Sequence, residues 1–148
     1  MKKILCSTIL ATMMFMSVES FAQNVYTDEQ VKPCGNELWC TLNGKLLTGI
    51  MKRFYPNGNL MVEATYKDGK LEGLGKLYYE NGNLKDETTF KDGKPEGLSK
   101  RYYENGNLRR EVIFESGQAV SGYNYGVYGK KTPMTNAHLY NMMKDLEF

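Results

Sequence analysis

The sequence predicts a mainly β protein, an antiparallel meander of tandem 24-residue hairpin repeats in an elongated sheet, capped by a short C-terminal α-helix. Residues 47–70, 71–94 and 95–118 align without gaps at that spacing. Each window carries Asn-Gly between alternating apolar residues, which is the strongest local signal for a hairpin. Tyrosine is enriched, with 11 residues against one tryptophan, and its amphipathic ring suits half-buried sheet faces.

Residues 1–22 have the pattern of a secretory signal peptide. Two lysines precede an apolar or weakly polar stretch at residues 4–18, and the small residues Ser20 and Ala22 occupy the −3 and −1 positions before Gln23. A transmembrane anchor is the alternative, but about 15 apolar residues are short for a bilayer span of roughly 20. We therefore expect an exported protein, either periplasmic or extracellular.

Residues 23–46 are expected to form an N-terminal cap that contains a disulfide. Cys34 and Cys40 are the only cysteines after residue 22, and an even pair in an oxidising compartment indicates one disulfide. A metal or redox pair is the alternative, but the spacing is not Cys-x-x-Cys and no further ligands lie nearby.

The three repeats at residues 47–118 each contain a strand, a turn and a strand, and a second turn such as Asp92-Gly93 joins one hairpin to the next. A four-residue first turn at residues 80–83 would place Tyr79 opposite Leu84. The same count gives three lysine–glutamate pairs that a one-residue slip would lose. These pairs are Lys52 with Glu63, Lys76 with Glu87 and Lys100 with Glu111.

This register predicts two different faces. One face would collect the repeat glycines (Gly49, Gly73, Gly97), three tyrosines (Tyr55, Tyr79, Tyr103), three leucines (Leu60, Leu84, Leu108) and a second aromatic set (Tyr66, Phe90, Phe114). The other would collect the lysine–glutamate pairs, Ile50, Leu74 and Leu98, and the rings of Phe54, Tyr78 and Tyr102. Both faces are half apolar, so neither is a simple solvated back.

The C-terminal part is expected to close the array. Residues 119–131 resemble a partial terminal repeat whose opening strand is shifted by one residue. Residues 132–148 are predicted to form an amphipathic helix that starts with Thr132 as N-cap and Pro133 as its first residue. Leu139, Met142, Met143 and Leu146 fall on one stripe of that helix. The helix would either cap the last hairpin or dock a partner.

The repeat pattern is Gly-Leu-x-x-x-Tyr-Tyr-x-Asn-Gly-Asn-Leu-x-x-Glu-x-x-Phe-x-x-Gly-Lys. It resembles the variant MORN repeats of many bacterial exported proteins, some of which are grouped as toxin–antitoxin antitoxins. The resemblance covers residues 42–128. It implies an elongated MORN-like sheet and a role as a scaffold, dimerisation module or membrane-associated spacer.

The sequence predicts neither a catalytic site nor a cofactor or metal site. The chain has one histidine, His138, with no recognised partner set around it. Glu63, Glu87 and Glu111 recur with lysine partners, which indicates a ladder rather than a catalytic pair of carboxylates. We therefore expect a protein that is not an enzyme.

The leading hypothesis is a protein-interaction or structural module of the bacterial envelope. The candidate contact residues are Tyr55, Tyr79, Tyr103, Lys52, Lys76 and Lys100. The same tyrosines could instead be a packing ladder of the repeat. Alternatives are a glycan or cell-wall binding array, although the single tryptophan lies outside the repeats, and an antitoxin-like partner of a secreted or periplasmic protein.

Charge restricts the partners further. Loss of residues 1–22 changes the formal charge from +2 to +1, so no nucleic acid and no strong membrane association is expected. Homo-oligomers through the sheet edges remain a hypothesis, because open edges can pair with another strand.

Overall fold

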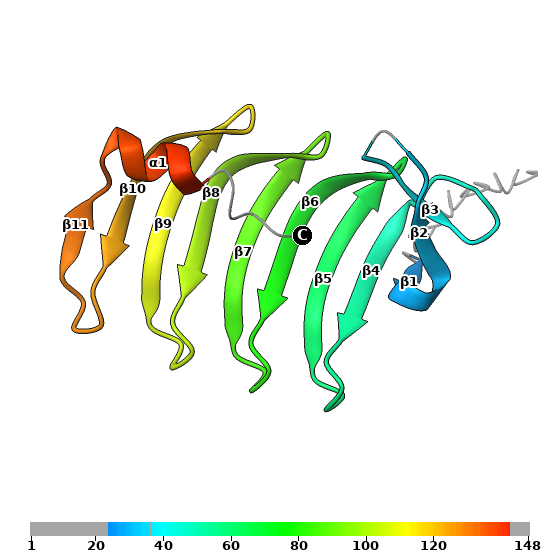
Figure 1. The fold of residues 1–148 in the computed structure, drawn as a ribbon, viewed down its shortest axis with the longest axis horizontal. Helices are drawn as coiled ribbons and strands as arrows, with labels where there is room; N and C mark the ends of the chain where they lie inside the picture. The colour runs from blue at the N-terminus through cyan, green and yellow to red at the C-terminus, as the bar shows by residue number, and fades with distance from the viewer. Residues whose placement is uncertain (1–23, 36, 143–148) are drawn as a thin grey trace, which may run out of the picture.

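The computed structural model describes residues 24–35 and 37–142, so the predicted signal peptide at residues 1–22 lies outside the described residues. The chain forms one long sheet with strands in the order β1-β4-β5-β6-β7-β8-β9-β10-β11, a small β2-β3 sheet and one short helix (Figure 1). The strands of the long sheet are β1 (Val25–Thr27), β4 (Gly49–Phe54), β5 (Leu60–Lys67), β6 (Lys70–Tyr78), β7 (Leu84–Lys91), β8 (Lys94–Tyr102), β9 (Leu108–Glu115), β10 (Gln118–Tyr125) and β11 (Lys131–Pro133). The predicted antiparallel meander of hairpins with a C-terminal helix is confirmed.

The first turn of each hairpin is a three-residue loop, and the four-residue loop predicted from the sequence is wrong. In the second repeat the Tyr79 N–H donates to the Asn83 carbonyl at 2.8 Å, and the Gly82 N–H donates to the Tyr79 carbonyl at 2.9 Å. Gly82 has a φ of +87°, the left-handed conformation that a three-residue loop requires at its last position. The Asn-Gly pair therefore selects the shorter loop.

A bulge at Lys85 compensates for the shorter loop. Tyr78 lies opposite Leu84, so the predicted pairing of Tyr79 with Leu84 is wrong. One extra residue in the returning strand then restores the register that the charges predicted. All three lysine–glutamate pairs are present: Lys52 with Glu63, Lys76 with Glu87 and Lys100 with Glu111.

The second turn is a two-residue loop of Asp-Gly type. Asp92 and Gly93 have φ values of +51° and +81°, as a type I′ turn needs at both central positions. The Gly93 N–H donates to the Leu71 carbonyl at 2.9 Å, which ties each second turn to the start of its own repeat. These turns therefore lie in line along one long edge of the sheet.

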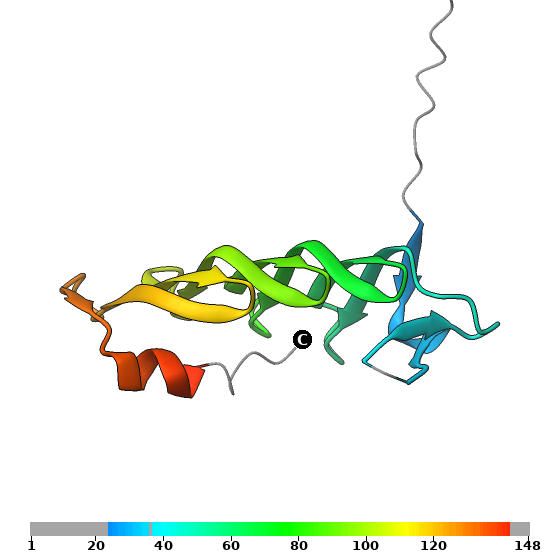
Figure 2. The same cartoon turned by 90° about the horizontal axis from the view of Figure 1, so that it is seen from above.

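The register divides the sheet into two faces. The first, which we call the covered face, carries the two terminal caps on the same side of the sheet (Figure 2). It presents two rows of directly paired residues and the aromatic residues Tyr66, Phe90 and Phe114, each opposite a glycine. The first covered row is Met51, Ala64, Gly75, Thr88, Ser99, Val112 and Gly122. The second covered row is Arg53, Val62, Leu77, Asp86, Arg101, Arg110 and Asn124.

The second face, the open face, carries the lysine–glutamate pairs. Because of the bulge, Leu60, Leu84 and Leu108 pair with Phe54, Tyr78 and Tyr102 and belong to this face, so their predicted place beside the repeat glycines is wrong. The predicted placement of Ile50, Leu74 and Leu98 on the same face as the lysines agrees with the register.

The N-terminal cap packs on the first hairpin. It comprises β1, which runs parallel to β4, a short 3-10 helix (Asp28–Gln30), β2 (Val31–Pro33) and β3 (Trp39–Thr41). The predicted disulfide joins Cys34 and Cys40. Beneath the N-terminal cap, a buried apolar cluster combines Val31 and Leu47 with Met51, Val62, Ala64 and Tyr66 of the sheet. A Cβ added at Gly69 would lie 2.9 Å from the Trp39 carbonyl oxygen, so this turn and the cap are in close contact.

The C-terminal end contains a fourth, incomplete hairpin and helix α1 (Asn136–Met142). Thr132 and Pro133 do not begin the helix as predicted but lie in β11, paired with Asn124 and Tyr123. A proline without an N–H is tolerated in an edge strand, so the Thr-Pro pair fits this role equally well. In α1 Leu139 packs against Val112 and Phe114, which is the contact of a capping helix. The predicted stripe residues Met143 and Leu146 lie outside the described residues.

Candidate interaction surface

The candidate tyrosines join neighbouring hairpins. The hydroxyl group of Tyr55 donates to the Tyr78 carbonyl at 2.7 Å, and Tyr79 donates to the Tyr102 carbonyl at 2.8 Å. Tyr103 repeats the contact with the Tyr125 carbonyl at 2.9 Å. Burial raises the pKa of Tyr79 above its ordinary value. The structure thus places these hydroxyl groups inside the array, where they tie one repeat to the next, and a role of the half-buried rings in partner contact stays a prediction.

Asparagines at the first turns make a parallel set of links. The side chain of Asn59 donates to the Glu80 carbonyl at 2.8 Å, and that of Asn83 donates to the Glu104 carbonyl at 2.8 Å. The repeated Asn-Gly-Asn sequence therefore does more than form the turn, because its last residue also attaches the tip of each hairpin to the next tip.

The candidate lysines form a continuous charge ladder on the open face. Lysine and glutamate alternate at directly paired positions from β4 to β9, and a tyrosine on β10 ends the row. In order, the row is Lys52, Glu63, Lys76, Glu87, Lys100, Glu111 and Tyr123. Lys52 Nζ lies 3.0 Å from Glu63 Oε2, and Lys100 Nζ lies 3.9 Å from Glu87 Oε1. Such partly exposed pairs contribute little stability each, about 0–1 kcal/mol.

Apolar side chains border the charge ladder on one side. Leu74, Leu98 and Ile113 are 44, 47 and 44% exposed, and the latter two are directly paired. We call these three residues, together with Ile50, the aliphatic strip of the open face. Three partly exposed aliphatic side chains in neighbouring hairpins are costly to leave in water and are typical of a contact surface.

Aromatic side chains border the ladder on its other side. The Tyr102 hydroxyl donates to Glu87 Oε1 at 2.9 Å, and the Tyr125 hydroxyl donates to Glu111 Oε2. Burial and the hydrogen bond to the Glu87 carboxylate raise the pKa of Tyr102 to about 12. At the last hairpin Lys131 Nζ lies 3.9 Å from the Tyr123 ring centroid, a cation–π contact. The open face is therefore amphipathic along its whole length.

Polar residues occupy the middle of the covered face. Arg101 Nε lies 2.5 Å from Asp86 Oδ1, and the hydroxyl groups of Thr88 and Ser99 are 2.7 Å apart. Asp86 Oδ2 is buried and has no hydrogen-bond partner. We call this part of the two covered rows, namely Gly75, Asp86, Thr88, Ser99, Arg101 and Arg110, the central strip.

Sequence reasoning missed the central strip, although a signal was present. In the covered rows Asp86 and Thr88 occupy the positions that hold Val62 and Ala64 one repeat earlier, so polar residues replace apolar ones at matched positions. A comparison of equivalent positions between repeats would have identified the substitution. Only the register shows that the replaced positions touch.

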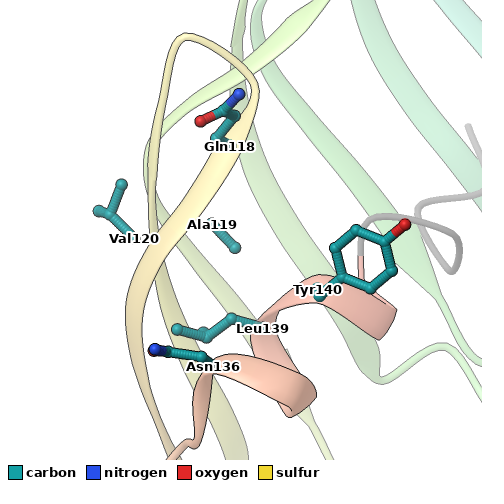
Figure 3. Close-up of a pocket in the computed structure, with 6 residues that line it drawn as sticks. All are labelled: Gln118, Ala119, Val120, Asn136, Leu139 and Tyr140. Carbon is teal, nitrogen blue, oxygen red and sulfur yellow. The ribbon is translucent and has the colours of Figure 1, made fainter.

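A pocket of about 390 Å³ lies between β10 and α1. It is lined by Gln118, Ala119, Val120, Asn136, Leu139 and Tyr140. In Figure 3 Ala119 and Leu139 extend into the space between strand and helix, and Tyr140 projects from the helix on the side away from the strand. Tyr140 is largely exposed, so this end of the molecule offers a second, smaller apolar surface beside the helix.

His138, the only histidine in the sequence, lies at the start of helix α1. His138 Nδ1 lies 3.0 Å from Thr135 Oγ1, and the His138 N–H donates to the same oxygen, so the histidine belongs to the start of α1. Among residues 24–35 and 37–142, no three or more side chains of the metal-binding types gather into a potential metal site. In that same part of the chain no helix has the length and hydrophobicity of a membrane span.

Among the comparisons with known proteins, only the comparison with protein families finds a match. No curated protein and no solved structure matches the chain. The family model described as MORN repeat variant matches residues 47–68, 71–92 and 95–116, one match in each hairpin repeat. Three tandem segments of the chain are therefore similar to the variant MORN repeat, the family that the sequence pattern resembles.

Proposed function

We propose that this chain is an exported, non-catalytic MORN-repeat protein that serves as a protein-interaction module of the bacterial envelope. The MORN repeat is generally a non-catalytic module that suggests protein interaction, which supports the class of function. The observation that carries the proposal is the open face, where an exposed aliphatic strip runs beside an alternating charge ladder.

A protein partner fits this face better than a nucleic acid or an anionic membrane. The ladder alternates lysine and glutamate, so the face has no net charge of one sign to attract polyanions. Leu98 and Ile113 offer apolar contact, and the ladder offers directional ion pairs that fix the register of a bound protein.

The test is a pull-down from envelope extract with residues 23–148 as bait. Leu74→Ser with Leu98→Ser removes part of the aliphatic strip. Leu42→Ser with Val127→Ser is the matched control, because these side chains are 61 and 57% exposed and lie in the cap and a loop rather than on the strip. A protein retained by the parent and by the control pair, but lost with the strip pair, supports the proposal.

Equal retention by all three baits would contradict it. Retention on peptidoglycan or polysaccharide, without a protein, would instead favour the glycan-binding alternative. An antitoxin-like role is the special case in which the retained protein is a secreted or periplasmic toxin, and inhibition of that toxin by the purified chain tests it.

Export has its own test. We expect the full chain, expressed in a Gram-negative host, to appear in the periplasm or medium with Gln23 as its first residue. An intact Met1 end in the cytoplasm would refute export while leaving the interaction function open.

A further inference from the structure

The charge ladder of the open face is complementary to a reversed copy of itself. Three lysines and three glutamates alternate strictly from β4 to β9, so the row begins with lysine at one end and with glutamate at the other. Uncharged residues flank the row, because Thr27 pairs with Lys52 at one end and Tyr123 pairs with Glu111 at the other. If a second row runs in the opposite direction, every lysine meets a glutamate.

A two-fold axis that runs along the strands, midway between β6 and β7, performs this reversal. It places each charged residue opposite the residue that lies equally far from the axis in the second copy, and each contact occurs twice. The facing pairs are Lys76 with Glu87, Glu63 with Lys100 and Lys52 with Glu111. All charged residues of the ladder thus face an opposite charge.

Other arrangements of two open faces bring like charges together. A two-fold axis that runs across the strands would place each residue of the ladder over its own copy, for example Lys52 over Lys52. An axis moved sideways onto β6 would place lysine against lysine and glutamate against glutamate along the whole row. Because like charges in contact oppose association, the ladder selects one orientation and one register.

The aliphatic strip obeys the same symmetry. About this axis Ile50 faces Ile113 of the second copy, while Leu74 and Leu98 face threonines. The side chains of Leu74, Leu98 and Ile113 are 44, 47 and 44% exposed. Removing them from water favours association, and the ladder then fixes the geometry of the complex.

The shape and size of the open face also suit a second copy. A uniformly twisted sheet is saddle-shaped, and this two-fold rotation maps the saddle onto itself, so two sheets can stack about 10 Å apart without diverging. Six strands of about eight residues present roughly 29 Å by 26 Å, or about 750 Å² per copy. A stable interface of standard size buries about 800 Å² per partner. The small sheet and α1 lie on the covered side and leave this stacking unobstructed (Figure 2).

We propose that the open face binds a second copy of this chain, face to face, about a two-fold axis that runs along the strands between β6 and β7. This inference rests on the proposed function, because it names the partner of the same face. The two edges of the sheet, β1 and β11, take no part in this contact.

Sedimentation equilibrium of the purified protein tests the proposal, and we expect the parent to form a dimer. Lys76→Glu would place glutamate against Glu87 of the second copy, and Glu87→Lys would place lysine against Lys76. Each change acts at two symmetry-related contacts and should weaken the dimer about ten-fold or more. Lys45→Glu makes the same change of charge at an exposed position in the N-terminal cap and should leave the dimer unchanged.

An equimolar mixture of Lys76→Glu and Glu87→Lys gives the sharpest result. In the mixed pair the glutamate at position 76 of one chain faces the lysine at position 87 of the other, so a heterodimer about as stable as the parent dimer should form. Circular dichroism of each variant shows whether its fold is retained.

A parent that is monomeric at every concentration would overturn the proposal. So would a dimer that Lys76→Glu leaves unchanged, or a mixture of folded variants that stays monomeric. None of these outcomes decides the proposed function, because the pull-down from envelope extract detects a different protein on the open face.

Discussion

The ion pair between Asp86 and Arg101 can be exchanged for an apolar pair that the chain itself provides. Arg101 Nε lies 2.5 Å from Asp86 Oδ1, and the two side chains are 17 and 4% exposed, arginine first. One repeat earlier the equivalent paired positions hold Val62 and Leu77, which pack in the N-terminal apolar cluster. Asp86→Val and Arg101→Leu, singly and together, therefore convert one boundary between hairpins into the other.

The single substitutions should be unequal. Arg101→Leu leaves a carboxylate that is 4% exposed without its cation, and we expect a loss of about 3–5 kcal/mol in the free energy of unfolding. Asp86→Val leaves a guanidinium that can turn toward water, so the loss should be about 1–3 kcal/mol. The double variant removes both charges, and its stability should lie within about 1 kcal/mol of the parent or exceed it.

Urea unfolding followed by far-UV circular dichroism at pH 7 measures these values, and an unchanged slope shows that the same surface is exposed in each variant. Lys52→Leu with Glu63→Leu is the control cycle on the open face, where the side chains are 32 and 29% exposed and coupling should not exceed about 1 kcal/mol. Losses that simply add in the Asp86 and Arg101 cycle would refute the view that the pair is buried and mutually dependent.

Three further predictions concern single contacts. Tyr79→Phe removes the hydrogen bond between hairpins to the Tyr102 carbonyl and should lower stability by about 1 kcal/mol in urea unfolding. The pKa of Tyr102 is about 12 in the fold against 10 when unfolded, so this residue contributes stability below pH 10 that is lost as the pH rises from 10 to 12. Tyr102→Phe cannot form the hydrogen bond to Glu87. It should therefore reduce the fall of the urea unfolding midpoint between pH 10 and about 12. Gly93→Ala should lower the stability by about 1–2 kcal/mol, because alanine is strained at its left-handed φ. Gly69→Ala should lower the stability clearly more, because its Cβ would also meet the N-terminal cap. Thermal unfolding measures both variants, and equal losses of stability would contradict the contact between Gly69 and the cap.

The features that recur with the repeat could be predicted from the sequence. The lysine–glutamate register was correct because a pair such as Lys76 and Glu87 must satisfy the same constraint in all three hairpins. The length of the first turn was predicted wrongly, because a three-residue loop with a bulge and a four-residue loop without one give the same register at Lys76. Only the pairing of Tyr78 with Leu84 separates the two.

The predicted start of the C-terminal helix was wrong for a different reason. Thr132 and Pro133 satisfy the requirements of a helix start, yet they also suit a short edge strand, where Pro133 has no N–H that needs a partner. The last hairpin decides between these roles, since the side of β10 that does not face β9 pairs with Thr132 and Pro133. No local property of the Thr-Pro pair contains that information.

The departures from the repeat indicate what each part of the covered face contacts. Under the N-terminal cap the first covered row carries Met51 and Ala64, and beside α1 it carries Val112, all apolar and buried. Between them Thr88 and Ser99 interrupt an otherwise apolar series, although the backbone at these positions is the same. A buried polar pair is tolerated inside a sheet face when its members satisfy each other, and the hydroxyl groups of Thr88 and Ser99 lie 2.7 Å apart. The covered face is therefore apolar under each terminal cap and internally hydrogen-bonded between them.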